Sequence, residues 1–218
     1  AMLKAQGIRK AYNQLVVLKD IHLEVAKGEI VSIVGASGAG KSTLLHILGT
    51  LDAPDAGQVW LDGEEVQKKS ATALARFRNQ RIGFIFQFHN LLAEFSALEN
   101  VMIPGLIGGT SRSQVEKRAS DLLARLGLGH RLHHKPSELS GGEQQRTAVA
   151  RALVNGPAVV FADEPSGNLD SQNARDLHQL FFDLRKEFGY TFVIVTHNTE
   201  LADMADRKLE IKDGKIVN

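Results

Sequence analysis

The chain has 218 residues, of which 43% are hydrophobic and 23% are charged, and its formal net charge is +1. This length suits one domain with a sizeable core, and the near-neutral charge gives no general reason to expect nucleic acid or anionic lipid as a partner. The sequence has no cysteine, which excludes disulfides and zinc–thiolate sites, and no apolar run approaches the roughly 20 residues of a membrane-spanning helix.

Residues 2–218 are expected to form a single domain, with Ala1 treated as a tag remnant. The first third of the chain is rich in β-strand patterns. Apolar and polar residues alternate over Leu3–Tyr12 and Val16–Val25, as in half-buried strands. A hairpin is expected over Val59–Val66, because its centre, Asp62-Gly63-Glu64, is typical of a turn.

A continuous apolar strand over Glu29–Val34 runs into a Gly-rich turn and then a helix over Lys41–Leu51. After another short buried strand, Ile82–Phe86, the pattern becomes helical from about residue 88 to 156. The expected helices of this block are Gln114–Leu126 and Gly141–Val154.

The last third alternates strands and helices again, and then ends in a hairpin. The expected elements are strand Ala158–Asp163, helix Ser171–Phe188, strand Thr191–Val195, helix Thr199–Met204 and a hairpin over Lys208–Val217 that turns at Asp213-Gly214. Strands that alternate with helices predict an α/β fold with a mostly parallel sheet covered on both faces. The block at about 88–156 would be a helical insertion between two strands, and the N-terminal strands an antiparallel β subdomain.

A phosphate-binding loop follows the strand that ends at Val34. The segment matches the pattern G-x-x-x-x-G-K-[ST] in full: Gly35, Ala36, Ser37, Gly38, Ala39, Gly40, Lys41, Ser42 and Thr43. Glycines let backbone N–H groups converge on phosphate oxygens, and the helix N-terminus adds its positive dipole end. We expect Lys41 to reach the β- and γ-phosphates and Ser42 to bind Mg²⁺. The pattern predicts a site for a nucleoside triphosphate.

Two adjacent acids end the apolar strand at residue 163. Asp163 at the strand end suits Mg²⁺, and Glu164 suits a general base that activates or orients the attacking water. Their roles are divided because two neighbouring carboxylates are costly without a cation between them. Alone, the pair could be two solvated acids at a strand end.

A second helix N-terminus follows Leu139. Ser140 and Glu143 form an S-x-x-E capping box, which is a sufficient local explanation of these two residues. Gly141 and Gly142 behind the cap leave free N–H groups accessible, as in an anion-binding surface.

With this Leu-Ser-Gly-Gly segment, the whole chain resembles the nucleotide-binding domains of ABC transporters. The resemblance implies a P-loop ATPase that binds ATP and Mg²⁺ and works as a homodimer, in which Ser140, Gly141 and Gly142 close over the ATP of the other protomer. It also implies roles for Tyr12 on adenine, Gln87 near Mg²⁺ and the attacking water, Asp170 at the dimer interface and His197 at the γ-phosphate.

Within that family, the sequence is similar to the branch that powers lipoprotein release. Residues 87–101 resemble the Gln-containing loop of that branch, and residues 163–170, DEPSGNLD, resemble a wider group with macrolide exporters and a cell-division ATPase. Ser166 stands where threonine is commoner, and Gln144 where arginine often follows the signature. The resemblance implies a peripheral subunit at the cytoplasmic face of a bacterial inner membrane, with no direct contact with the lipid cargo.

The membrane subunits are expected to dock near Phe88–Leu106. Part of this segment has helical spacing typical of core, but Phe88–Phe95 follows Gln87 directly as an apolar loop. An apolar groove there would accept a short helix of the partner.

Other functions remain open at this level. A macrolide or peptide exporter or a division-site complex would use the same ATPase. A soluble ABC protein acting on DNA or ribosomes usually has tandem domains or long arms, and a phosphotransferase would need a lid in place of the Leu-Ser-Gly-Gly segment. The His130, His133 and His134 cluster is interpreted as a loop, and Arg76, Arg78 and Arg81 as a charged helix face, so no nucleic-acid partner is expected.

Overall fold

Six strands form the central sheet of the protein, seen in a computed structural model that describes residues 1–36, 38 and 40–218. The strand order is β10-β9-β3-β8-β7-β6, in which all pairs are parallel except β9 with β10. The bounds are β3 Ile30–Val34, β6 Ile82–Phe86, β7 Val159–Asp163, β8 Thr191–Val195, β9 Arg207–Lys212 and β10 Lys215–Ile216. Strands β3, β7 and β8 are buried over almost their whole length, as expected for parallel strands covered on both faces.

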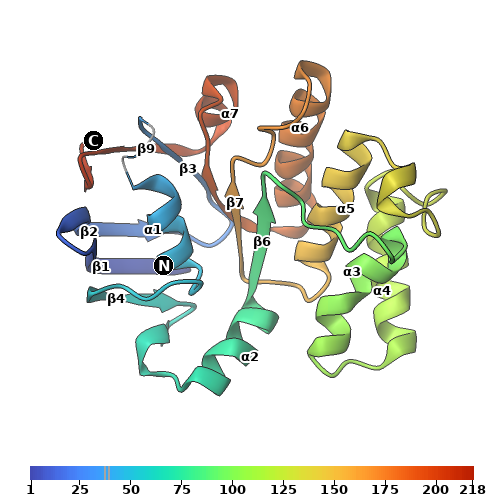
Figure 1. Ribbon diagram of the computed structural model, residues 1–218, viewed down its shortest axis with the longest axis horizontal. Coiled ribbons are helices and arrows are strands. Elements are labelled where there is room, and N and C mark those ends of the chain that lie inside the picture. Colours follow the sequence, from blue (N-terminus) through green and yellow to red (C-terminus); the bar gives the residue numbers. More distant parts are fainter. Residues whose placement is uncertain (37, 39) are drawn as a thin grey trace.

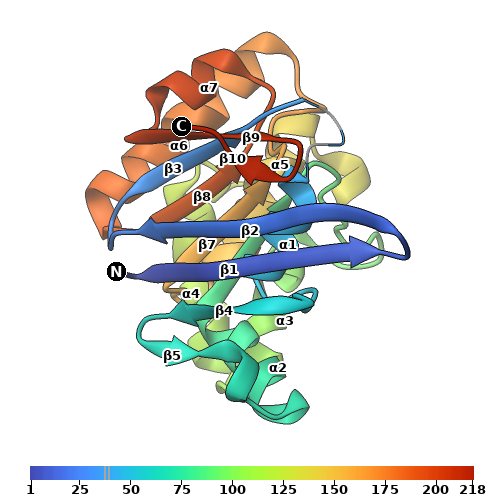
Figure 2. The ribbon, with the colours of Figure 1, turned by 90° about the vertical axis from the view of Figure 1, so that its left-hand side faces the viewer.

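Four further strands form an antiparallel sheet of order β2-β1-β4-β5 beside the central one (Figure 2). The bounds are β1 Leu3–Tyr12, β2 Leu15–Val25, β4 Ala56–Leu61 and β5 Glu64–Glu65. Asp62 and Gly63 connect β4 to β5 with φ values of 51° and 81°. A two-residue loop with two positive φ angles is the type I′ hairpin turn, for which Asp-Gly is suited. The Asp213-Gly214 turn has the same geometry, with φ values of 51° and 77°. Both predicted hairpins are confirmed.

Three helices, α3 Ala97–Ile107, α4 Arg112–Arg125 and α5 Gly141–Leu153, lie between β6 and β7 along the chain. They form one side of the molecule, opposite β1, β2 and β4 (Figure 1). The remaining helices are α1 Lys41–Leu48, α2 Ala71–Arg81, α6 Ser171–Phe188 and α7 Thr199–Met204, with short 3₁₀ turns at Val66–Lys68 and Pro136–Glu138. The predicted fold class, with its antiparallel β part and helical insertion, is confirmed.

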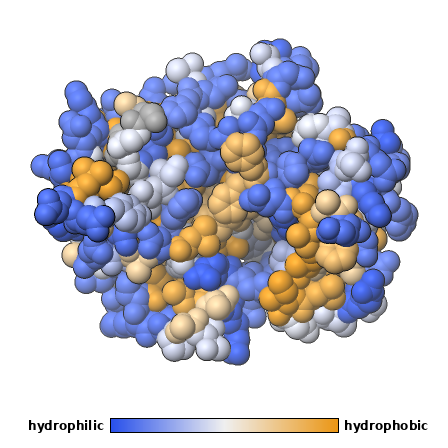
Figure 3. Space-filling view, in the orientation of Figure 1, coloured by the Kyte–Doolittle hydropathy of each residue, from blue (hydrophilic) through white to orange (hydrophobic). Residues whose placement is uncertain are grey.

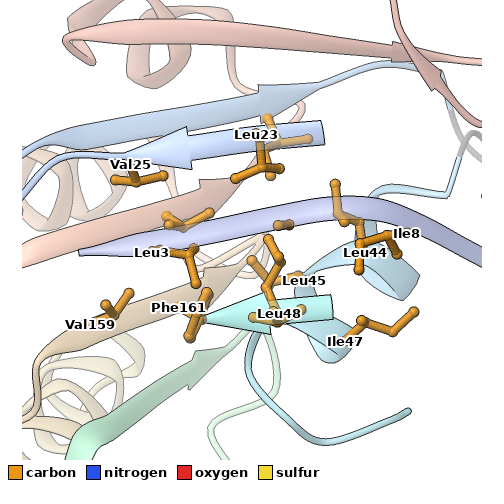
Figure 4. Packing of buried hydrophobic residues seen from close by; sticks show 14 of the residues in the cluster. Leu3, Ile8, Leu23, Val25, Leu44, Leu45, Ile47, Leu48, Val159 and Phe161 are labelled. Carbon is orange, nitrogen blue, oxygen red and sulfur yellow. The ribbon is translucent and has the colours of Figure 1, made fainter. Parts of the chain in front are cut away.

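The two faces of the central sheet carry different helices. Val159 and Phe161 of β7 pack in the same hydrophobic cluster as α1 and the antiparallel sheet, as Figure 4 shows. Val160 and Ala162 point the other way, into the cluster formed with α3, α4, α5 and α6. Because side chains alternate across a strand, α1 and α5 cover opposite faces of the central sheet.

The helix expected over Lys41–Leu51 is shorter than predicted and ends at Leu48. Thr50 adopts a left-handed conformation, with φ at 66°, which stops the helix. A Cβ on Gly49 would lie 2.0 Å from the Phe84 ring, so close approach of β6 requires glycine at this helix end. The other expected bounds agree with the observed ones to within two residues, except that β4 begins at Ala56, three residues before the expected Val59. Within the described part of the chain, no helix combines the length and apolarity required to cross a membrane.

Candidate functional site

The predicted functional segments follow four neighbouring parallel strands. The phosphate loop follows β3, Gln87 follows β6, Glu164 follows β7 and His197 comes soon after β8. Since the carboxyl ends of parallel strands meet at one edge of the sheet, these segments share that edge. An open parallel sheet binds ligands at this place.

The phosphate loop has its lysine folded inward. The Lys41 side chain is buried, and its Nζ donates hydrogen bonds to the carbonyl oxygens of Gly35 at 2.7 Å and Ala36 at 3.1 Å. Two of the predicted loop residues, Ser37 and Ala39, lie outside the described residues. The Lys41 ammonium group is thus bonded to backbone carbonyls of the same loop that is expected to bind a phosphate.

Backbone geometry explains the glycines of this loop. Gly35, Gly38 and Gly40 have φ values of 152°, 80° and 99°. A Cβ on Gly40 would also lie 2.9 Å from the Leu18 side chain, so this position requires glycine for both conformation and space. Helix α1 begins at Lys41, directly after Gly40. No side chain among the described residues caps its N-terminus. The first-turn N–H groups and the dipole of α1 are directed at the loop.

Two oxygen-bearing side chains, Ser42 and Asp163, lie close together beside the loop. Ser42 Oγ donates a hydrogen bond to Asp163 Oδ1 at 3.2 Å, and Asp163 Oδ2 lies 3.6 Å from His46 Nε2. Neighbouring ligands of an octahedral Mg²⁺ are about 2.9 Å apart, given metal–oxygen distances of about 2.0–2.1 Å. A hydroxyl and a carboxylate with this separation fit the donor set that Mg²⁺ prefers.

Glu164 is held in an unusual backbone conformation beside His197. Its φ is 47°, and for a non-glycine residue such a conformation costs about 1–3 kcal/mol. Its carboxylate accepts a hydrogen bond from the His197 backbone N–H at 3.1 Å, and Oε1 lies 3.1 Å from His197 Nε2. Despite that contact, Oε1 is buried and makes no aligned hydrogen bond with the described residues. The His197 ring is thus the nearest polar neighbour that the structure gives this oxygen.

Gln87 contacts the segment that follows β7. Its Nε2 donates to Asn168 Oδ1 at 3.1 Å, and Asn168 Nδ2 donates back to the Gln87 carbonyl at 3.3 Å. A Cβ on Gly167 would lie 2.8 Å from the Gln87 amide, so this glycine allows the side chain to pack on the backbone. The structure places Gln87 beside the segment that carries Glu164.

Tyr12 lies at the end of β1, with 46% of its surface exposed. Its hydroxyl donates to Asp52 Oδ2 at 3.0 Å, and Lys10 Nζ lies 5.3 Å from the ring centre. Partial burial, together with the hydrogen bond to Asp52, raises the pKa of Tyr12, and a hydrogen bond with Thr43 of α1 opposes that rise. The ring is anchored at its polar end near the phosphate loop, and it keeps exposed surface for stacking.

The capping box at the start of α5 is formed in full. Ser140 Oγ accepts from the Glu143 N–H at 3.1 Å, and Glu143 Oε1 accepts from the Ser140 N–H at 2.9 Å. The hydrogen bond from the Ser140 backbone lowers the pKa of Glu143. The N–H groups of Gly141 and Gly142 come before the first residue with an intrahelical acceptor, so they remain available to an anion.

Asp170 forms the N-cap of α6. Its Oδ1 accepts from the Asn173 N–H at 2.8 Å, and Oδ2 accepts from Asn173 Nδ2 at 3.1 Å. The backbone hydrogen bond from Asn173 lowers the pKa of Asp170. Both oxygens therefore have partners within the chain.

Comparison with known proteins identifies the family. Residues 18–167 match the family described as ABC transporter. The chain belongs to the ABC transporter family.

Its ABC relatives match over nearly their full length. The "Lipoprotein-releasing system ATP-binding protein LolD" of Cytophaga hutchinsonii is 62% identical, covering 99% of each chain. The protein of the same name from Bacteroides thetaiotaomicron is 60% identical, also with 99% of each covered. Among solved structures, a dimeric ATP-binding cassette in a post-hydrolysis state, bound to ADP and Pi, has a TM-score of 0.90 at 39% identity, covering 100% of this chain and 97% of that one.

Two buried polar side chains of this ABC domain were missed by the sequence reasoning. Gln145 of α5 is 3% exposed and His178 of α6 is 1% exposed. His178 Nε2 lies 2.7 Å from Ser166 Oγ, and burial lowers the pKa of His178. Both residues occupy the buried stripe of an amphipathic helix, and a polar residue in that stripe was the signal that could have found them.

Proposed function

We propose that this chain is the ATP-hydrolysing subunit of an ABC exporter that releases lipoproteins from the inner membrane toward the outer membrane. The observation that carries the proposal is the shared name of relatives that match over nearly the whole length of both chains. The phosphate loop, the strand-end acids and His197 at one sheet edge support the ATPase part. In this proposal the subunit is peripheral, on the cytoplasmic face, and contacts neither nucleic acid nor the lipid cargo.

Nucleotide binding would use the loop of residues 35–43. Lys41 Nζ would exchange its contacts with the loop carbonyls for β- and γ-phosphate oxygens, which carry more negative charge. The loop N–H groups and the α1 dipole would hold the phosphates, and the exposed Tyr12 ring would stack on adenine.

Hydrolysis would use the residues after β6, β7 and β8. Ser42, Asp163 and Gln87 would hold Mg²⁺, which when bound neutralises charge on the phosphates. Glu164 Oε1 would accept a proton from the attacking water, and His197 would hold the Glu164 carboxylate through its backbone N–H. The His197 ring, whose Nε2 lies 3.1 Å from Glu164 Oε1, would contact the γ-phosphate once ATP is bound.

Replacement of Glu164 tests the chemistry. Glu164→Gln is expected to keep ATP binding and to lower kcat on the order of 10²-fold or more, because an amide cannot accept the proton. Binding of a fluorescent ATP analogue and phosphate release would both be measured. Glu116→Gln, an exposed residue of α4, serves as the matched control. Turnover at the wild-type rate in Glu164→Gln would show that the general base is another group.

A homodimer would bring the start of α5 to a phosphate loop. Within one chain, α1 and α5 cover opposite faces of the central sheet, which favours a phosphate loop and a start of α5 that act on different nucleotides. A second protomer would supply Ser140, Gly141 and Gly142, with Asp170 nearby at the interface. Glu164→Gln with ATP is expected to elute as a dimer on size-exclusion chromatography, and as a monomer without nucleotide. A monomer at saturating ATP would contradict the sandwich.

The membrane subunits would dock in a hollow between the two sides of the molecule. The hollow has a volume of about 480 Å³ and lies between α2, β6, α3 and α5. Apolar surface gathers around it along the middle of the face shown in Figure 3. Of the segment Phe88–Leu106, Asn90 and Pro104 line the hollow, while Leu92 and Phe95 are 44% and 40% exposed. A short amphipathic helix of a membrane subunit fits this combination.

Docking can be tested on two sides of the hollow. Ala75 of α2 lines it, and Ala75→Arg should block a docked helix, whereas Ala73→Arg on the same helix is the control. Leu92→Asp with Phe95→Asp tests the adjoining loop. Basal ATPase should stay near wild type, and co-purification with the membrane subunits should be lost in Ala75→Arg and in the double variant. Normal co-purification in both would place the docking site elsewhere.

The cargo can be tested with the complete transporter. The chain would be co-purified with its membrane subunits, reconstituted in liposomes and supplied with ATP. ATP-dependent release of a lipid-modified lipoprotein is expected. Transport of a macrolide or peptide without lipoprotein release would favour an exporter of that kind.

A further inference from the structure

A buried glutamine side chain joins the ends of two neighbouring strands. Gln145 lies on α5, and its Nε2 donates to the carbonyl oxygen of Phe86 at 2.9 Å and to that of Pro165 at 2.6 Å. Phe86 is the last residue of β6, and Pro165 comes two residues after the end of β7. The side chain is 3% exposed, so water does not replace these two hydrogen bonds freely.

The two strands need this amide because their own ladder stops here. The β6–β7 pairing ends at Phe86 with Asp163. The next N–H, that of Glu164, donates instead to Val195 of β8 at 2.8 Å, and Pro165 has no N–H. After Asp163, neither Glu164 nor Pro165 can therefore donate a backbone hydrogen bond to the Phe86 carbonyl. Each hydrogen of the Gln145 amide satisfies one of the two carbonyl groups.

The two hydrogen bonds of Gln145 are called the Gln145 clamp below. The segment after β7 that this clamp holds contains Glu164, whose backbone is strained. Glu164 has a φ of 47° and precedes a proline, which further restricts its backbone. On one side its N–H is fixed to β8, and Gly167 N–H donates to its carbonyl at 3.0 Å. The hydrogen bond from Gln145 fixes the carbonyl of the following residue. A conformation of this kind persists where its surroundings determine it from several sides.

The same clamp reaches the segment of Gln87. That residue directly follows Phe86, and its side chain is paired with Asn168. Gln145 thus fixes the segments after β6 and β7 at one end, and the Gln87–Asn168 pair joins them farther along. The residue that holds them belongs to α5, which begins at the Ser140 capping box.

We propose that Gln145 is a positioning residue for ATP hydrolysis, whose amide holds the segments of Glu164 and Gln87 in register. This rests on the proposed role of Glu164 as general base. Gln145 does not touch nucleotide in this scheme. Its loss should therefore change the chemical step and leave nucleotide affinity unchanged.

Gln145→Met tests this, because methionine fills nearly the same volume and has no donor. We expect kcat to fall roughly 10- to 100-fold, as for a small misplacement of a reacting group. KM for ATP and the Kd of a fluorescent ATP analogue should stay within about 2-fold of wild type. Gln179→Met is the control, since Gln179 is exposed on α6 and its Nε2 donates to Asp183 at 3.0 Å. That variant should keep the wild-type kcat.

Several outcomes would overturn the inference. One is a wild-type kcat in folded Gln145→Met, and another is a raised KM and Kd with kcat unchanged. If Gln145→Met does not fold, Gln145→Asn is measured instead, which keeps the amide with a shorter reach. The same fall in kcat is expected there, and failure of both variants to fold would mean that Gln145 only stabilises the fold. Glu164→Gln, run in parallel, separates the two proposals: if it is inactive while Gln145→Met is fully active, only the role of Gln145 is wrong.

Discussion

Two helices of the protein begin with the same capping box, which allows the cap of α5 to be separated from a role in ATP hydrolysis. In α3, Ser96 Oγ accepts from Glu99 N–H at 3.1 Å and Glu99 Oε1 accepts from Ser96 N–H at 2.9 Å. Ser140 and Glu143 of α5 show the same two distances. Ser96→Ala and Ser140→Ala therefore remove the same local interaction from two helices.

The stability cost should be at least as large for the buried Ser96 as for the exposed Ser140, whereas a functional cost is expected for Ser140 alone. Loss of a serine N-cap costs about 1 kcal/mol, which lowers Tm by about 2–4 °C in a chain of this size. If Ser140 also donates to a phosphate of the partner's ATP, its loss removes a hydrogen bond to a charged group. Such a bond contributes about 1.5–3 kcal/mol, so ATPase activity should fall roughly 10- to 100-fold in Ser140→Ala alone.

Differential scanning fluorimetry and phosphate release, with both variants at one protein concentration, would measure the two effects. Concentration must be matched because the active species is expected to be a dimer. A Tm loss in both variants with near-wild-type ATPase rates in both would refute the reasoning, and Ser140 would then be a helix cap without a further role.

Further predictions concern binding, pH and packing. Lys41→Ala should remove most of the ATP-induced rise in Tm, because the inward-facing ammonium is the cation of the phosphate loop. Burial holds the pKa of His178 below 6.5, so the unfolded chain binds more protons below that pH. The free energy of unfolding should then fall as pH drops below 6.5, and unfolding at several pH values should show a smaller fall in His178→Gln. Gly83→Ala should lower the free energy of unfolding by about 1–3 kcal/mol, because its Cβ would lie 2.5 Å from the Ala152 carbonyl oxygen. Gly129→Ala, with 3.5 Å to its nearest neighbour, should be close to neutral in the same denaturant titration.

The sequence predicts best where one residue type alone satisfies a local constraint. Asp62-Gly63 marks a hairpin because both positions take positive φ, and the apolar runs of β3 and β7 mark buried parallel strands. The end of α1 was missed because it depends on β6. Gly49 has to admit the Phe84 ring, which lies far along the chain.

The candidate site shows the same division. The order of strands predicts that Glu164 and His197 share one edge of the sheet, since each segment follows a parallel strand. The left-handed φ of Glu164 and the hydrogen bonds of Gln145 were not predicted, because both depend on the segment after β7, whose backbone bonds to β8 once its pairing with β6 ends. Local pattern carries no information on that turn.

The two signature glycines have different explanations in the structure. A Cβ on Gly142 would lie 2.4 Å from Asn173 Oδ1, so packing within the chain already favours glycine there unless the Asn173 side chain moves. Gly141 meets nothing closer than 3.9 Å, at Leu169 Cδ2, and its φ is outside the left-handed region. An alanine would fit and would favour the helix by up to about 1 kcal/mol. The fold of one chain therefore gives no reason for glycine at 141, whereas close approach of a partner's phosphate to its N–H gives one. Gly141→Ala should accordingly leave Tm equal to or above that of wild type while lowering ATPase activity, and a fully active variant would remove this argument for a signature that acts on the partner's nucleotide.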